Sequence, residues 1–220
     1  MLAEPLSIMP ILATPLGIAV VPGSEELNLS LRDLFASRIE SDIRPPQNPL
    51  RFFSEENLMD WPEQPIRMLS ETMIGAVYAF LGSVSEIDDA QLRACKLETR
   101  AWFSVIRTNG SVPAANYPLT SWCAIYCVAA PRLPDVRADG GVLRLYESRL
   151  GTTFQDATNS VMRVPYSSSH YAWRPVPGRM VIFPASLTHE IGLMRATGEL
   201  ILVTARLRFT APGQQGFRRW

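Results

Sequence analysis

The sequence predicts a mainly β fold with flanking helices (α+β): a double-sheet jelly roll with two N-terminal helices packed outside it. From residue 101 onward, short runs of β-branched, aliphatic and aromatic residues alternate with turn signals, and before that point apolar residues recur at helical spacing. The chain has 220 residues, 47% of them hydrophobic, which is enough for one domain with a sizeable core. We therefore expect a single domain over residues 1–220. It would comprise an N-terminal extended segment and helices (1–100), a jelly-roll core (101–210) and a tail (211–220).

The N-terminal part is predicted to open as a strand pair or an extended segment and to continue as a helix. Residues 8–21 are largely apolar and end at the turn signal Pro22-Gly23. Ser24 is the expected N-cap of a helix over residues 25–39, because a hydroxyl can accept a hydrogen bond from a free backbone N–H of the first turn. Leucines at positions 27, 31 and 34 would then recur along this helix.

A second amphipathic helix is predicted over residues 64–82. Gly82 is the expected C′ residue that ends it, and the charged segment that follows, residues 86–100, is predicted to lie on the solvated surface. The apolar positions that recur at helical spacing are Ile66, Leu69, Met73, Val77 and Phe80.

Five strands are predicted in the second half of the chain. Each run is rich in residues that favour a pleated, half-buried surface, and each is bounded by glycine, proline, asparagine or aspartate. The clearest turns are Asn109-Gly110 and Asp139-Gly140-Gly141. The expected strands cover residues 101–107, 122–129, 142–146, 180–183 and 200–209.

Charge and cysteine content argue against several classes of partner and site. The 21 basic and 21 acidic residues balance, so we expect no nucleic-acid surface and no binding to an anionic membrane. The apolar start, Met1–Val21, lacks a basic leading region and contains three prolines, which argues against a signal peptide or a membrane span. Cys95, Cys123 and Cys127 lack metal-site spacing and are expected to be reduced core thiols in a cytoplasmic protein.

The most informative stretch is Arg174–His189. Pro177-Gly178 signals a turn, the apolar run 180–183 has the length of a buried strand, and Pro184 ends that strand. His189 follows five residues later and is one of two histidines in the chain. This arrangement would direct an imidazole into the mouth of a barrel, although a lone histidine beside apolar strands more often has a structural role.

The chain resembles the small bacterial 2-oxoglutarate/iron(II)-dependent oxygenases, whose core is a cupin-like, double-stranded β-helix. The matches keep their order from residues 11–16 to the last strand. They comprise a tryptophan strand, a glycine turn, a proline, an apolar strand, a Gly-x-Leu stretch, and an element of the type Pro-x-Gly, Phe-Pro-Ser-x-Leu-x-His. In this chain they are Trp102, Gly110, Pro118, Cys123–Val128, Gly141–Arg149, Pro177-Gly178 and Val181–His189.

The resemblance implies an iron site made by three protein ligands and an arginine that pairs with 2-oxoglutarate. The two positions of the family's His-x-His element fall on Ala115 and Tyr117, the distal ligand falls on His189, and the arginine position falls on Leu200. An alanine methyl cannot ligate iron, and a phenol is a poor replacement for an imidazole. A leucine cannot pair with a carboxylate. Of these four positions, only His189 keeps the family's chemistry.

Two sets of residues could compensate for part of this loss. His170, in the loop 167–173, could join His189 and either Asp156 or Glu147 around a metal.

Arg206 would share a strand face with Leu200, and Arg195 matches a family position just before the last strand. Either arginine could bind an anionic ligand, although a solvated or structurally paired arginine is the more common case. The pocket residues expected from the resemblance are Tyr117, Trp122, Tyr126 and His170.

The residues leave three interpretations open. The first is an oxygenase-like barrel that has lost standard iron and 2-oxoglutarate binding and that binds a small molecule or a partner. In this interpretation, we expect no cofactor. The second is an active non-haem iron hydroxylase with a rearranged site that uses His189, and only then would iron(II) and 2-oxoglutarate be cofactors. The third is a purely structural or interaction protein, which a mouth filled by Tyr117, Leu200 and Trp122 would favour. The resemblance also suggests a homodimer, which no pattern in the sequence tests.

Overall fold

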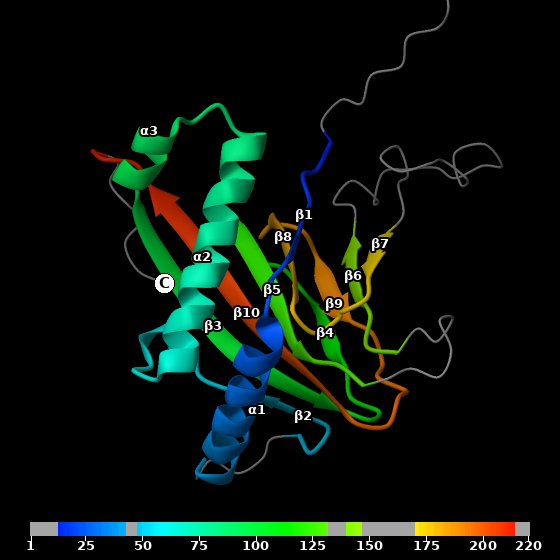
Figure 1. The fold of residues 1–220 in the computed structure, drawn as a ribbon. Helices are drawn as coiled ribbons and strands as arrows, with labels where there is room; N and C mark the ends of the chain where they lie inside the picture. Colours follow the sequence, from blue (N-terminus) through cyan, green and yellow to red (C-terminus); the bar gives the residue numbers. More distant parts are fainter. Residues whose placement is uncertain (1–12, 43–47, 132–139, 147–169, 214–220) are drawn as a thin grey trace, which may run out of the picture.

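Two antiparallel sheets stack face to face, and helices cover the outer face of the larger one (Figure 1). The computed structural model describes residues 13–42, 48–131, 140–146 and 170–213. This arrangement is the predicted jelly roll with external helices. None of the described helices is long and apolar enough to cross a membrane.

The larger sheet has six strands, and its centre is the long antiparallel pair β3 (Lys96–Arg107) and β10 (Glu199–Thr210). These two strands pair over twelve residues, from Glu199 opposite Arg107 to Thr210 opposite Lys96. The sheet also takes two strands from the N-terminal part of the chain, and the first of them lies within the predicted opening segment 8–21. In spatial order the strands are β1 (Gly17–Val20), β8 (Arg179–Pro184), β5 (Trp122–Ala129), β10, β3 and β2 (Arg51–Phe53).

The smaller sheet has four short strands. In spatial order they are β4 (Val112–Ala115), β9 (His189–Ile191), β6 (Leu143–Tyr146) and β7 (His170–Trp173). All five predicted strands are confirmed, as β3, β5, β6, β8 and β10. The sequence does not predict β2, β4, β7 or β9, which have only three or four residues each. β6 is equally short, but the turn signal Asp139-Gly140-Gly141 before it marks its start.

The first helix is confirmed with a different start. Helix α1 (Ser24–Glu40) follows Gly23, which has φ 63° and takes the N-cap position, so Ser24 is the first helical residue and not the cap. A left-handed conformation costs glycine little, which explains why this residue precedes the helix.

The second helix continues past its predicted end. Helix α2 (Gln64–Val84) runs through Gly82 and stops at Ser85, so Gly82 is an interior residue rather than the C′ stop. The segment predicted as solvated surface contains a short helix, α3 (Asp89–Ala94), and the start of β3. Asp88 and Gln91 form a capping box at the start of α3.

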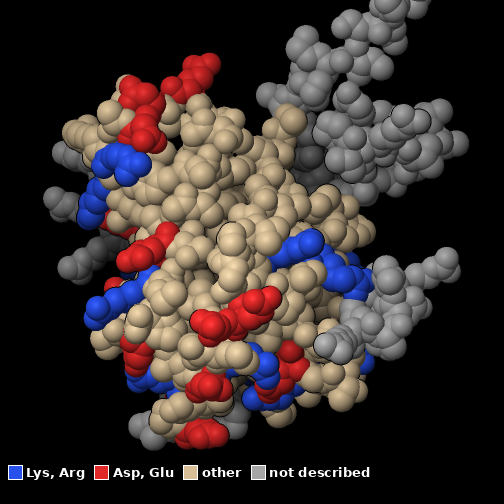
Figure 2. Space-filling model, in the orientation of Figure 1, with Lys and Arg blue, Asp and Glu red and all other residues tan. Residues whose placement is uncertain are grey.

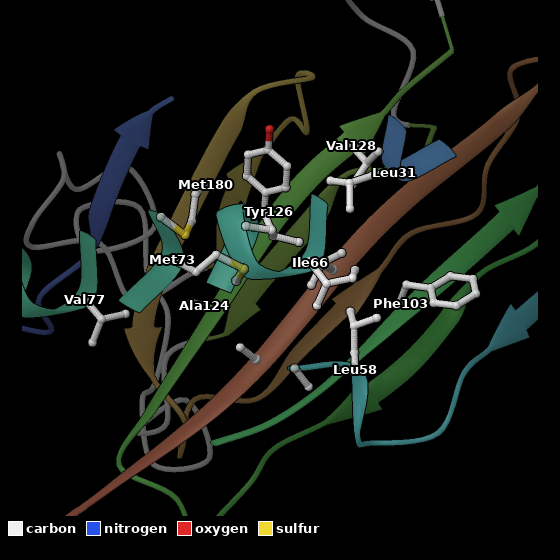
Figure 3. Close-up of a cluster of buried hydrophobic side chains, with 14 of the residues drawn as sticks. Leu31, Leu58, Ile66, Met73, Val77, Phe103, Ala124, Tyr126, Val128 and Met180 are labelled. Carbon is white, nitrogen blue, oxygen red and sulfur yellow. The ribbon is translucent and has the colours of Figure 1, made fainter. Parts of the chain in front are cut away.

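A first core lies between the helices and the larger sheet (Figure 3). Phe103 of β3 stacks on Phe35 of α1 with 4.1 Å between ring centroids. Phe103 also contacts the ring of Trp61, beside the short 3-10 helix η1 (Leu58–Asp60). Ile66, Met73 and Val77 of α2 and Leu31 of α1 are buried in the same cluster. The apolar stripes of both helices are therefore core positions.

A second core lies between the two sheets. Strand alternation divides β10 between the two cores: Leu200 and Leu202 face the interior of the barrel, and Ile201 and Val203 face the helices. β5 divides in the same way, with Cys123 and Cys127 on the face toward the barrel interior. Both thiols are buried, whereas Cys95 is only partly buried, so the prediction of a core thiol is wrong for Cys95.

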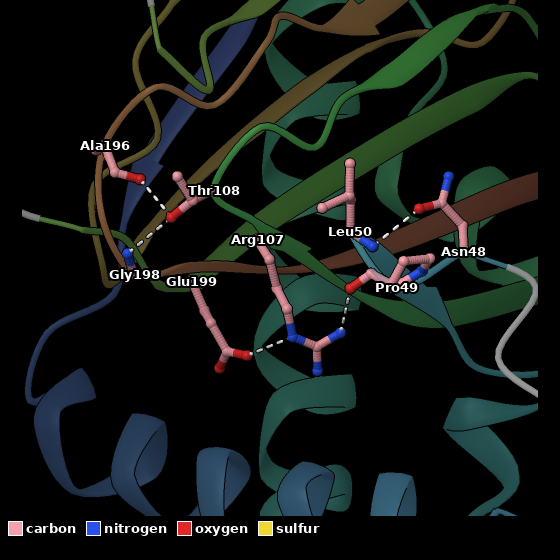
Figure 4. Close-up of polar contacts among 8 residues, drawn as sticks. All are labelled: Asn48, Pro49, Leu50, Arg107, Thr108, Ala196, Gly198 and Glu199. Atoms are coloured by element: carbon pink, nitrogen blue, oxygen red, sulfur yellow. Dashed lines mark hydrogen bonds and ion pairs between the residues drawn. The ribbon is translucent and has the colours of Figure 1, made fainter.

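Polar contacts close the end of the barrel at which β10 begins (Figure 4). Arg107 donates to Glu199 at 3.0 Å and to the Pro49 carbonyl at 3.3 Å. Thr108 Oγ1 donates to the Ala196 carbonyl at 3.0 Å and accepts from the Gly198 N–H. These bonds tie the turn before β10 to the end of β3.

The surface agrees with the balanced composition. Acidic and basic side chains are interspersed over the face shown in Figure 2, and on the described part of that face neither sign forms a broad patch. A nucleic-acid surface needs an excess of positive charge on one face, and this face does not supply one.

Candidate functional site

His189 lies at the start of β9, between β4 and β6 of the smaller sheet. It is opposite Ala115 on one side and opposite Leu145 on the other, and it is only 7% exposed. Its Nδ1 lies 3.0 Å from the carbonyl oxygen of Leu187. Because a carbonyl can only accept, Nδ1 carries the proton of the neutral ring. The sequence element that ends β8 at Pro184 thus places the imidazole inside the barrel, as predicted.

Tyr117 packs against this imidazole. The two ring centroids are 5.3 Å apart, and Phe183 of β8 packs on the His189 ring with a centroid distance of 5.1 Å. Tyr117 in turn contacts Trp102 of β3 edge-to-face at 5.8 Å. Such edge-to-face pairs stabilise a packed core. The imidazole is therefore held in an aromatic cluster.

Burial keeps the groups in this cluster uncharged. Loss of hydration lowers the pKa of His189, and the hydrogen bond to Leu187 offsets part of that effect. Burial raises the pKa of Tyr117 and also that of Cys123, and the nearby Arg206 guanidinium opposes both shifts. At neutral pH, Tyr117 is a phenol and not a phenolate.

Arg206 closes the cluster on the side of the larger sheet. Its guanidinium lies 4.8 Å from the ring centroid of Tyr117 and 5.3 Å from that of Trp102, which is cation–π geometry. The same guanidinium forms an ion pair with Glu56, and Arg100 lies 3.7 Å from the same carboxylate oxygen. The Arg206 side chain is only 14% exposed. Arg206 is therefore a largely buried cation at the edge of the aromatic cluster.

Solved structures that share this architecture include 2-oxoglutarate-dependent oxygenases. The α-ketoglutarate-dependent carbocyclase SnoK from nogalamycin biosynthesis superposes with a TM-score of 0.62 at 11% identity, covering 92% of this chain and 84% of that one. A Pseudomonas putida prolyl-4-hydroxylase superposes with a TM-score of 0.58 at 14% identity, covering 89% of this chain and 92% of that one. HygX from Streptomyces hygroscopicus, solved with nickel and 2-oxoglutarate, has a TM-score of 0.58 at 10% identity, covering 94% of this chain and 86% of that one. The fold is the double-stranded β-helix of these oxygenases. No family model and no curated protein sequence matches the chain.

The double-stranded β-helix brings together the three positions that the resemblance assigns to iron ligands. Ala115 is paired with His189 across the β4–β9 ladder, and Tyr117 contacts the His189 ring. The donor set is a methyl group, a neutral phenol and one imidazole. In the described part of the chain, no three His, Cys, Asp or Glu side chains come together as a metal site. These residues do not fit an iron(II) facial triad.

The position of the cosubstrate arginine is equally unsuited. Leu200 is 2% exposed and lies in the apolar core between the sheets, opposite Ile106. Arg206 shares its strand face, as predicted, but lies six residues along β10, about 20 Å away at the usual rise of a strand. Arg206 therefore cannot replace an arginine at position 200.

Of the four predicted pocket residues, only Tyr117 lies beside His189; Trp122, Tyr126 and His170 do not. Trp122 and Tyr126 point from β5 toward the helices: Trp122 contacts Phe80 of α2, and the Tyr126 hydroxyl donates to Asn28 of α1 at 2.7 Å. The prediction that Trp122 and Tyr126 line the pocket is therefore wrong. Successive side chains of a strand point to opposite faces, and both residues lie on the face opposite to Cys123, which faces the barrel interior.

His170 lies on the outer face of the smaller sheet. Its ring contacts Tyr146, whose hydroxyl donates to Glu190 at 2.6 Å. Glu190 follows His189 directly, so its side chain points to the opposite face. His170 therefore does not join His189 in a metal site. Arg195 is exposed in the turn between β9 and β10. Asp156 and Glu147 lie outside the described residues.

Sequence reasoning missed Glu56 and Arg100. Glu55-Glu56 has the composition of a solvated acidic pair, and nothing in its spacing relates it to Arg206, 150 residues later. The contact depends on the pairing of β2 and β3, which places this loop beside β3, the neighbour of β10 in the sheet.

We expect the unfolding free energy to fall as the pH drops below the ordinary histidine pKa of 6.5, and His189 to cause part of this fall. The pKa of His189 is lowered in the folded state, so below 6.5 the unfolded chain binds more protons than the folded one. Denaturant unfolding between pH 7.5 and pH 5 should show this loss in the wild type and in His170→Gln. The loss should be smaller in His189→Gln; equal slopes in all three proteins would contradict the assignment.

Proposed function

We propose that this chain is an oxygenase-fold protein that does not bind iron and 2-oxoglutarate in the standard way and acts as a binding barrel for a small molecule or a partner. The observation that carries the proposal is the packing of Tyr117 against His189. An aromatic ring lies where the resemblance puts an iron ligand.

The surrounding residues support this proposal in two ways. Arg206 is stacked on Tyr117, and a guanidinium carries only N–H donors, so it offers no ligand for a metal beside that ring. The interior near Leu200 is apolar, so a dicarboxylate entering there would lose its hydration without gaining a cation. Metal and cosubstrate binding are thus disfavoured by separate features.

The alternative is an active iron oxygenase with a rearranged site. It rests on His189, which keeps the position and the burial of a distal ligand. It needs further ligands that the described residues do not bring to His189.

A thermal-shift titration tests the proposal. Metal-free protein would be titrated under anaerobic conditions with iron(II), with and without 2-oxoglutarate. A ligand at about 100 times its dissociation constant stabilises a fold by about 2.7 kcal/mol, and each kcal/mol raises the Tm of a domain of this size by about 2–4 °C. We expect no shift. A shift that requires both ligands and is absent in His189→Ala would favour the active oxygenase.

A further inference from the structure

Two arginines face each other across the central strand pair of the larger sheet. Arg100 of β3 lies directly opposite Arg206 of β10, and both alternate with the residues that face the helices. Like charges at directly opposite positions of a sheet destabilise it. An anion between the two guanidiniums would offset that repulsion.

Glu56 supplies that anion. Its carboxylate pairs with both guanidiniums, at 3.7 Å from Arg100 and in direct contact with Arg206. The backbone of Glu56 is fixed at this place, because its carbonyl accepts from the Ala101 N–H at 3.2 Å. The Glu56 side chain is 45% exposed. The carboxylate is therefore tethered to the site, but it is open to exchange with solvent.

Arg206 is preorganised for a carboxylate. Trp102 and Tyr117 hold its guanidinium by two aromatic contacts, and the side chain is mostly buried. A guanidinium offers a planar fork that matches a carboxylate, and the pairing is stronger where water is partly excluded. The site thus combines one fixed guanidinium, from Arg206, with one half-exposed guanidinium, from Arg100.

We infer that Arg100 and Arg206 bind the carboxylate of a small-molecule ligand, and that Glu56 occupies the site as a tethered competitor. This inference rests on the proposed function, since it names the ligand class of the binding barrel. Binding exchanges one carboxylate for another, and no covalent bond changes. A tethered competitor acts at an effective concentration in the millimolar range or above, so weakly bound acids are excluded while Glu56 is in place.

Titration calorimetry with succinate tests the inference. The protein is metal-free, and phenanthroline is present to chelate any residual metal. Glu56→Gln keeps the size of the side chain but removes its charge, and it should bind succinate at least about tenfold more tightly than the wild type. Glu56→Asp keeps the charge and serves as the matched control, with affinity near that of the wild type. The neutral analogue succinamide should bind to none of these proteins.

Removal of either arginine should abolish the increase in succinate affinity that Glu56→Gln produces. Arg206→Gln and Arg100→Gln, each combined with Glu56→Gln, should lose the tighter binding. Arg100 is half exposed, so the second combination remains informative if the first does not fold. Unchanged succinate affinity in Glu56→Gln, or equal affinity with and without both arginines, would overturn the inference. Tighter binding of inorganic phosphate than of succinate would overturn the assignment to a carboxylate. No metal is used, so the outcome is separate from the iron test of the proposed function.

Discussion

Replacing Leu200 with arginine is expected to lower the unfolding free energy by about 3–5 kcal/mol, the usual cost of an uncompensated buried charge. Leu200 is 2% exposed among apolar side chains between the sheets. In an oxygenase with its cosubstrate, an arginine here would pair with a carboxylate. In this barrel, we expect 2-oxoglutarate not to restore the lost stability, because Ala115 and Tyr117 offer no imidazole for a metal that would help to hold the cosubstrate.

Denaturant unfolding measures this effect, with Leu200→Met as the matched control. Methionine conserves volume and charge, so its cost should stay below about 1.5 kcal/mol. If Leu200→Arg folds with nearly unchanged stability, or if 2-oxoglutarate restores the stability of the variant, the interior retains a cosubstrate site and our account of it is wrong.

Phe103→Ala is expected to cost about 3–5 kcal/mol, as large-to-small changes of buried aromatics usually do. The Phe103 side chain is fully buried, stacks on Phe35 at 4.1 Å and contacts Phe52 and Trp61. It links β3 to α1, β2 and the loop that carries Glu56. Removal of the Phe103 ring should therefore weaken the attachment of the helices to the larger sheet.

Phe53→Ala provides the comparison for this variant. Phe53 lies on the edge strand β2 and is 37% exposed, so its removal should cost much less. Chemical denaturation of both variants gives the two free energies. Similar losses for the two phenylalanines would show that the helix-side core does not dominate stability as the packing around Phe103 indicates.

The fold was largely predictable from the sequence because its main elements are long and periodic. β3, β5 and β10 combine dense apolar runs with clear turn signals, and α1 and α2 show helical spacing. The helix ends were less predictable. Gly82 could have served as a C′ residue, but α2 continues to Val84. Local propensity does not decide such boundaries by itself.

The site was predictable only where it depends on position within one strand. His189 follows directly from the element that ends β8, and Arg206 from the parity of β10. The faces of Trp122 and Tyr126 could not be assigned, because both faces of β5 are apolar and buried. The Glu56 contact depends on long-range strand pairing, which no local pattern reveals.

Our central proposal is that the chain does not bind iron in the standard way, because Tyr117 packs on His189 at a position where the resemblance puts an iron ligand. The most direct test is anaerobic equilibrium dialysis against iron(II) and 2-oxoglutarate, with bound iron measured by elemental analysis in the wild type, His189→Ala and the double variant Ala115→His/Tyr117→His. We expect only trace iron in the wild type, no more than in His189→Ala, and an increase in the double variant. Stoichiometric iron in the wild type that disappears in His189→Ala would contradict the claim.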